Sequence, residues 1–273
     1  MSYNIILNST NVNNSTNSQY KFNFITGNFT VKEGAQICVS QIQIPYSWFN
    51  ITQNYTNNKF NIIDWLGTVY NITLPDGFYT VADINNFLEI YAINNGLYLI
   101  NNTGQNVYYL QLYTNQQYYS NQLLFYPVPI ALPVGWVAPA NWVGFPAVTT
   151  APQFVVLNNN FTIYSGFNAG TYGGGPTPSS VLSQNVPLGS NVNSLVIRCN
   201  LVSNPVGFPT DIVDTFAVEG IFGANINYEP KFEKWVKIKA GTYNNLVVDI
   251  VDQQYNNIDI IDKNLTISLL LKN

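Results

Sequence analysis

The residues of this chain that could do chemistry are few, because it has no histidine and only 9% of its residues are charged. Triads and zinc sites that need histidine are therefore unavailable. Four carboxylates fall within 14 residues of one another, and these are Asp249, Asp252, Asp259 and Asp262. They could hold calcium, but their spacing matches no EF-hand or other oxygen-ligand loop, so turn and outward-facing strand positions are favoured. The sequence predicts no catalytic residues, no metal and no cofactor, and hence a protein that is not an enzyme.

The only cationic cluster consists of Lys231, Lys234, Lys237 and Lys239, with Glu229 and Glu233 interleaved. This pattern favours the solvated face of a strand over a phosphate-binding patch. The net charge of −4 gives no general attraction to nucleic acid, so no direct nucleic-acid binding is expected.

Four aromatic residues form the candidate binding set, namely Trp136, Trp142, Phe145 and Tyr172. Such rings can stack on sugars or bases. Anchoring of a protein interface, or local packing, is the favoured interpretation. The four residues are therefore our predicted interface residues.

The distribution of charge is the most unusual property of the chain. The 108 positions from Ile90 to Ile197 contain no Asp, Glu, Lys or Arg, whereas about a quarter of the residues in ordinary soluble domains are charged. Asn, Gln, Tyr, Gly and Pro replace them. Such a surface suits a subunit that packs against copies of itself, because no charge has to be stripped of water.

The elements that must position these residues are mostly strands. Period-2 alternation is clear at 195–201, 236–239, 246–250 and 265–271. Between Ile37 and Ile44 the parity of the apolar residues changes, which indicates a bulge or a run buried on both faces. One helix is expected at about 81–94, after a capping box formed by Thr80 and Asp83.

The middle of the chain differs from both ends. Residues 98–189 are first rich in Tyr, Asn and Gln and then in Pro, Trp and Gly, which predicts an inserted lobe of strands and long loops. Cys38 and Cys199 lie in apolar runs and are expected to be buried free thiols. The first residues have neither a basic nor an apolar signal-peptide region, so a reducing interior is expected.

Several segments in fixed order resemble the penton (minor capsid) proteins of virophages and related polinton-like viruses. The segments that carry the resemblance are 43–51 (QIPYSWFNI), 74–88 (LPDGFYTVADINNFL), 196–202 (VIRCNLV), 235–252 (WVKIKAGTYNNLVVDIVD) and 256–269 (NNIDIIDKNLTISL). The resemblance covers about 1–97 and 190–273 and is weak or absent between them.

The resemblance implies an all-β fold, a single jelly-roll β-sandwich with one short helix. Residues 1–97 and 190–273 would form the jelly roll, and 98–189 the inserted outer lobe. It also implies a structural protein of the virion, made in the host cytoplasm, of which five copies close a vertex of an icosahedral capsid and contact the major capsid protein. A closed fivefold ring uses one heterologous contact repeated around the axis.

One alternative from another class stays open, a jelly-roll module that binds carbohydrate or a receptor. It would use Trp136, Trp142 and the tyrosines of 108–126 as stacking platforms. The two alternatives overlap, because an outer lobe of a vertex protein can also meet a receptor or glycan on the host surface.

Overall fold

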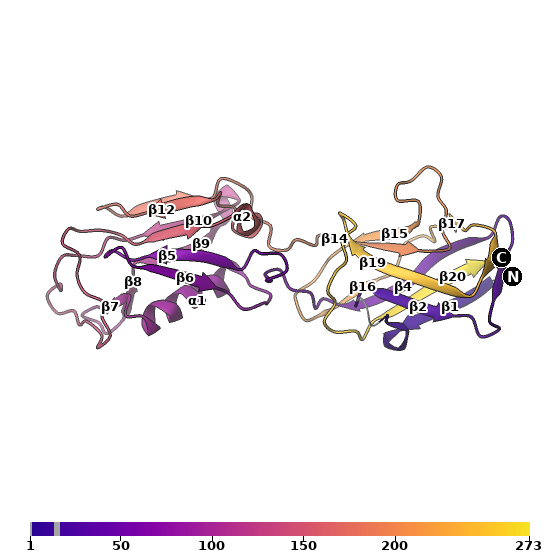
Figure 1. Ribbon diagram of the computed structural model, residues 1–273, viewed down its shortest axis with the longest axis horizontal. Coiled ribbons are helices and arrows are strands. Elements are labelled where there is room, and N and C mark those ends of the chain that lie inside the picture. Colours follow the sequence, from indigo (N-terminus) through magenta and orange to yellow (C-terminus); the bar gives the residue numbers. More distant parts are fainter. Residues whose placement is uncertain (1, 14–16) are drawn as a thin grey trace. The chain divides into compact units, whose positions relative to one another are not determined.

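The computed structural model describes residues 2–13 and 17–273, which form two compact units. The sandwich unit comprises the described residues up to Trp48 together with Val192–Asn273, and the inserted unit comprises Phe49–Asn191. The chain thus leaves the first unit after one of its strands, builds the second unit, and returns (Figure 1).

Eight strands make up the two main sheets of the sandwich unit. They are β1 (Ser2–Asn8), β2 (Gln19–Asn23), β4 (Gln36–Pro45), β14 (Ser194–Cys199), β15 (Ile212–Ala217), β16 (Asn225–Tyr228), β19 (Asn245–Asp252) and β20 (Thr266–Lys272). Three short strands and a 3-10 turn accompany them, namely β3 (Phe29–Val31), β17 (Val236–Lys237), β18 (Gly241–Tyr243) and η1 (Ser9–Asn11).

The order of these strands defines the fold. One sheet runs β1-β20-β4-β16 and the other β15-β14-β19-β2, with antiparallel pairing throughout. Counted along the chain, each of the eight strands lies in the other sheet from the one before it, except β15, which pairs directly with β14. This arrangement of two Greek keys is the jelly-roll topology, so the sandwich unit is a single jelly roll, as the resemblance implies.

Alternation along the strands explains why the two sheets face each other. Every second residue of β19 and β20 is fully buried, as Leu246, Val248 and Ile250 illustrate. Both cysteines are buried free thiols, as predicted. The parity change in β4 is a bulge, because Leu269 pairs with Val39 and Ser268 with Gln41, which leaves Ser40 as the extra residue.

Two edge strands of opposite sheets, β15 and β16, are joined by a polar contact. The buried carboxylate of Asp214 lies 2.6 Å from the ammonium of Lys234 and accepts a 2.8 Å hydrogen bond from the hydroxyl of Tyr228. The Tyr228 ring stacks on Phe216 at 4.3 Å. The hydrogen bond to Asp214 raises the pKa of Lys234. Lys234 is therefore not simply part of a solvated strand face, whereas Lys231, Lys237 and Lys239 are exposed.

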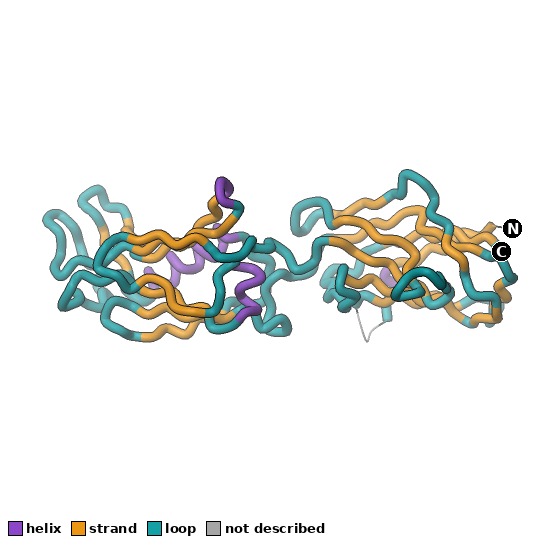
Figure 2. The backbone as a smooth tube through the Cα atoms, turned by 90° about the horizontal axis from the view of Figure 1, so that it is seen from above, coloured by secondary structure: helices purple, strands orange, loops and turns teal. Residues whose placement is uncertain are grey.

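The regular structure of the inserted unit is also mainly β-strand, drawn as orange tube in Figure 2. A four-stranded sheet has the order β12-β11-β5-β6 and a three-stranded sheet the order β13-β10-β9. The strands are β5 (Lys59–Ile63), β6 (Val69–Thr73), β7 (Tyr98–Ile100), β8 (Asn106–Tyr108), β9 (Leu110–Asn115), β10 (Ser120–Phe125), β11 (Gln153–Val156), β12 (Gly170–Gly173) and β13 (Ser179–Leu182). The helices are α1 (Val81–Asn94) and α2 (Asn159–Ser165), with the 3-10 turn η2 (Gln116–Tyr118).

Helix α1 forms where the sequence predicts it. The backbone N–H of Asp83 donates to the Thr80 hydroxyl, and the Asp83 carboxylate accepts from the Thr80 N–H, which completes the capping box. These hydrogen bonds lower the pKa of Asp83. The helix ends before Gly96, whose φ of +66° suits glycine. Ile84 and Leu88 face a core shared by both sheets, to which Phe60, Phe125 and Phe154 also belong.

Two predictions about this unit need correction. The insertion begins at Phe49 and ends at Asn191, so residues 49–97, including α1, belong to it and not to the jelly roll. The reason is pairing, because β5 joins β11 through Ile62 and Phe154. A second helix, α2, exists besides α1, and the side chain of Asn158 caps its first turn. Among residues 2–13 and 17–273, no helix is both long and apolar enough to cross a membrane.

The two ends of the inserted unit are fastened to each other. The side-chain amide of Asn50 is 1% exposed and donates 2.8 Å hydrogen bonds to the carbonyl oxygens of Tyr79 and Gly189. Its oxygen accepts from the N–H of Tyr79. The chain therefore enters and leaves this unit at one place.

Candidate interaction surfaces

Three of the four predicted interface residues meet in one aromatic cluster of the inserted unit. Trp142 stacks on Trp65 with ring centroids 5.1 Å apart and an interplanar angle of 27°, and Phe145 lies 5.2 Å from Trp142. Trp136 packs against the same cluster, whose buried members are Trp65, Leu97, Leu99, Tyr109 and Val128. Trp136, Trp142 and Phe145 are half-buried, so each offers only part of its ring to a partner.

Hydrogen bonds to backbone carbonyls and one close approach of two backbone segments hold this cluster together. The indole N–H of Trp65 donates a 2.8 Å hydrogen bond to the carbonyl of Gly144, and the side chain of Asn141 donates to the carbonyl of Ile93 at the end of α1. A Cβ added to Gly96 would lie 1.8 Å from the carbonyl oxygen of Asn141, so glycine is required at this crossing. The loop that carries Trp142 therefore packs closely against the end of α1.

The proline-rich loop 127–152 exposes apolar side chains beyond the cluster. They are Val134 (100% exposed), Val148 (70%), Ile130 (60%), Val137 (56%) and Leu132 (42%). Exposed aliphatic residues of this number on one loop are typical of a contact surface. They are the better anchors for a partner, since the rings behind them are already packed.

Tyr172 lies apart from the tryptophan cluster. Its ring meets Phe167 edge-to-face at 5.3 Å and packs on the other core of the inserted unit, and its hydroxyl donates to the carbonyl of Asn168. The four predicted residues are therefore divided between two cores.

Two aspartates of the inserted unit have local partners. Buried Asp64 accepts hydrogen bonds from the N–H groups of Leu66 and Thr68 and from the hydroxyl of Tyr70. Burial, followed by the charge of Asp64, raises the pKa of Tyr70 to about 12. Asp83 caps α1. Residues 90–191 contain no charged side chain, so their polar side chains are amides, phenols and hydroxyls.

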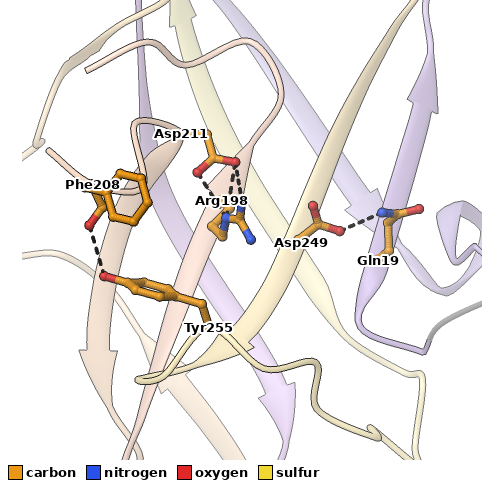
Figure 3. Close-up of polar contacts among 6 residues, drawn as sticks. All are labelled: Gln19, Arg198, Phe208, Asp211, Asp249 and Tyr255. Atoms are coloured by element: carbon orange, nitrogen blue, oxygen red, sulfur yellow. Dashed lines mark hydrogen bonds and ion pairs between the residues drawn. The ribbon is translucent and has the colours of Figure 1, made fainter. Parts of the chain in front are cut away.

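The sandwich unit carries the other polar site, on the outer face of the β15-β14-β19-β2 sheet (Figure 3). The guanidinium of Arg198 on β14 donates to both carboxylate oxygens of Asp211 at 2.8–3.1 Å. In the next strand Asp249 lies opposite Arg198 and accepts a 2.7 Å hydrogen bond from Gln19. The hydrogen bond to Asp211 raises the pKa of Arg198.

This row of side chains holds loops rather than substrates. The Arg198–Asp211 pair and the 3.4 Å hydrogen bond from Tyr255 to the Phe208 carbonyl fasten the loop between β14 and β15 onto the sheet (Figure 3). On that loop Val206 and Phe208 are more than 90% exposed. The aspartates near the C-terminus likewise serve turns, since Asp252 accepts from the N–H groups of Gln254 and Asn256.

Sequence reasoning misses Trp65 and the exposed valines. Trp65 lies far from Trp142 in the chain, and no local pattern links them. The valines could have been found from the density of aliphatic residues in a loop where polar ones are usual.

The chain is similar to two solved viral structures. A crystal structure of mavirus penton protein has 9% sequence identity and a TM-score of 0.44, covering 100% of this chain and 98% of that one. A chain of the Sputnik virophage, from a cryo-EM structure, has 13% identity and a TM-score of 0.41, covering 99% and 97%. No family model matches the sequence, and neither does any curated protein.

Proposed function

We propose that this protein is a structural subunit of a viral capsid, a penton whose five copies close a vertex of the shell. The observation that carries the proposal is a single jelly roll joined to an inserted unit in which residues 90–191 are uncharged and the loop 127–152 exposes apolar side chains. Jelly rolls recur in capsid and lectin domains. The sequence motifs that resemble penton proteins support the finer parts of the proposal. These are the pentamer, the vertex position and the contact with a major capsid protein.

The absence of charged side chains from residues 90–191 lowers the desolvation cost of burying this surface in an assembly. A charged side chain that becomes buried without a partner is strongly unfavourable, whereas covering aliphatic groups is favourable and covering amides or phenols costs little once they find hydrogen-bond partners. Interfaces between subunits are in fact poor in charge at their centres. The surface of 90–191 meets that requirement along its whole length.

The loop 127–152 is our proposed contact between copies or with the major capsid protein. Val134 projects entirely into solvent, and the neighbouring tryptophans are held by packing behind it. Trp136, Trp142 and Phe145 then act mainly as supports of the contact surface, each offering its exposed part, whereas Tyr172 is a proposed interface residue on the other core of the inserted unit.

The test is the mass of the full-length protein by light scattering over a concentration series, alone and with a major capsid protein. The expected species has a mass near five times 30.6 kDa. Val134→Asp should reduce assembly, while Gln117→Asp, which adds the same charge at another exposed position of the inserted unit, should leave it unchanged. A monomer that stays monomeric in both settings, with no binding to the capsid protein, contradicts the proposal.

A further inference from the structure

A groove at the tip of the β9–β10 hairpin has features of a binding site. It measures about 460 Å³ and is lined by Thr114, Asn115, Gln116, Tyr119, Ser120 and Pro187. This volume lies within the range of about 300–1,000 Å³ that small-molecule sites occupy. All of these residues belong to the inserted unit.

One buried polar group of the groove lacks a partner within the chain. Ser120 is 7% exposed, and its hydroxyl makes no hydrogen bond with any described residue. A buried hydroxyl without a partner is unfavourable by about 1–3 kcal/mol, so such groups usually have one. Ser120 lines the groove but its hydroxyl oxygen has almost no exposed surface, so a ligand hydroxyl can pair with it only if the Ser120 side chain rotates toward the groove.

A second polar group is held in a fixed orientation. The side-chain N–H of Asn115 donates a 2.8 Å hydrogen bond to the amide oxygen of Gln122, whose own N–H donates to the Ser180 hydroxyl at 2.6 Å. This chain of bonds fixes which way the Asn115 amide points, and its oxygen accepts no hydrogen bond from the described residues. An amide oriented beforehand loses less entropy when it binds.

Aromatic rings stand at the rim. Tyr118 is 66% exposed and Tyr119 is 75% exposed. Tyr119 has φ +51° and ψ +42°, a left-handed conformation that is uncommon for a residue with a large side chain. Strain of this kind is often found at binding sites. Tyr119 lines the groove and contributes a large, amphipathic side chain to it.

The chemistry of the lining selects the ligand. No charged residue lines the groove, and every charged residue of the inserted unit falls between Lys59 and Glu89. An ionic ligand would lose hydration there and gain no counter-charge. Hexose rings combine an apolar face, which stacks on tyrosine, with hydroxyls, which pair with amides and with Ser120. We propose that this groove binds an uncharged oligosaccharide, a function additional to assembly.

The first experiment applies the full-length protein to an array of neutral hexose oligosaccharides and their sialylated and sulfated counterparts. We expect retention on neutral probes that does not change with salt concentration, because no ion pair takes part. Binding to the acidic probes alone, or to none, overturns the proposal.

Two variants separate binding from folding. Tyr119→Gly removes the ring and places at φ +51° the residue that tolerates it best, so the fold is kept while affinity for a bound neutral probe falls by about tenfold. Ser120→Ala should leave the melting temperature unchanged or raised, because it deletes an unpaired hydroxyl, and should still weaken binding. Tyr126→Ala, at a 40% exposed tyrosine outside the groove, is the matched control and should bind normally.

The mass of each variant is measured on the same samples. Wild-type binding by Tyr119→Gly and Ser120→Ala overturns the proposal. If these variants bind every probe as the wild type does but change the mass of the assembly, the groove is a contact between copies and the proposal is wrong. Normal glycan binding by a strict monomer instead contradicts only the capsid function.

Discussion

Replacement of Trp142 by alanine tests whether this ring supports the inserted unit or is free for a partner. Trp→Ala at a fully buried site destabilises by about 3–5 kcal/mol. Trp142 is half-buried and stacked on Trp65, so roughly half of that loss is expected. Its indole N–H is buried without a partner, and deleting it returns part of the loss. The net expectation is about 1 kcal/mol, or roughly a fivefold change in the unfolding equilibrium.

Hydrogen exchange measured by mass spectrometry assigns the effect to one unit. Amides of β7 and β9 should exchange roughly fivefold faster in Trp142→Ala, and those of β14 and β19 in the sandwich unit should be unchanged. Val134→Ala, on the same loop but 100% exposed, is the control and should change neither. Equal exchange in Trp142→Ala and wild type would refute the packing argument and return Trp142 to the candidate interface.

Three further predictions concern the inserted unit. Gly96→Ala should lower its stability by more than about 1 kcal/mol, because φ is +66° and the new Cβ meets the Asn141 carbonyl; thermal unfolding measures this. Tyr109→Phe should be neutral or stabilising, since the buried hydroxyl has no partner. Burial raises the Tyr109 pKa to about 12, so between pH 10 and 12 the unfolded state loses the Tyr109 proton while the folded state keeps it. The free energy of unfolding should therefore be constant below pH 10 and fall as pH rises towards 12. Denaturation at several pH values should find this fall reduced in Tyr109→Phe. The pKa of Asp83 is lowered, so its stabilisation is present above pH 3.8 and is lost as pH falls further; Asp83→Asn should reduce that acid sensitivity, measured by circular dichroism.

Local patterns were sufficient for four of the eight jelly-roll strands, β4, β14, β19 and β20, and for α1. The alternation of β19 and β20 reflects burial on one face, and the Thr80–Asp83 capping box needs only four residues. The bulge at Ser40 is likewise visible as a change of parity. In each case the signal lies within one element, so a single sequence contains it.

The domain boundary and the second helix could not be found in this way. The segment Lys59–Ile63 reads like another strand of the sandwich, and only its pairing with Phe154 assigns it to the inserted unit. Helix α2 has seven residues, two of them β-branched, and its stability comes from Phe161 in the core. The packing of Trp142 on Trp65 is equally non-local.

The position of the insertion has a consequence for the order in which the chain is synthesised. β4 and β14 are separated by the whole inserted unit, and β20, which follows every other strand in the chain, lies between β1 and β4 in the finished sheet. The inserted unit contains all its own pairing partners and can fold on the ribosome as soon as Asn191 has emerged. The jelly roll cannot close until its central strand β20 arrives, so β1 and the edge of β4 opposite β16 remain unpaired until then and are the segments most exposed to aggregation.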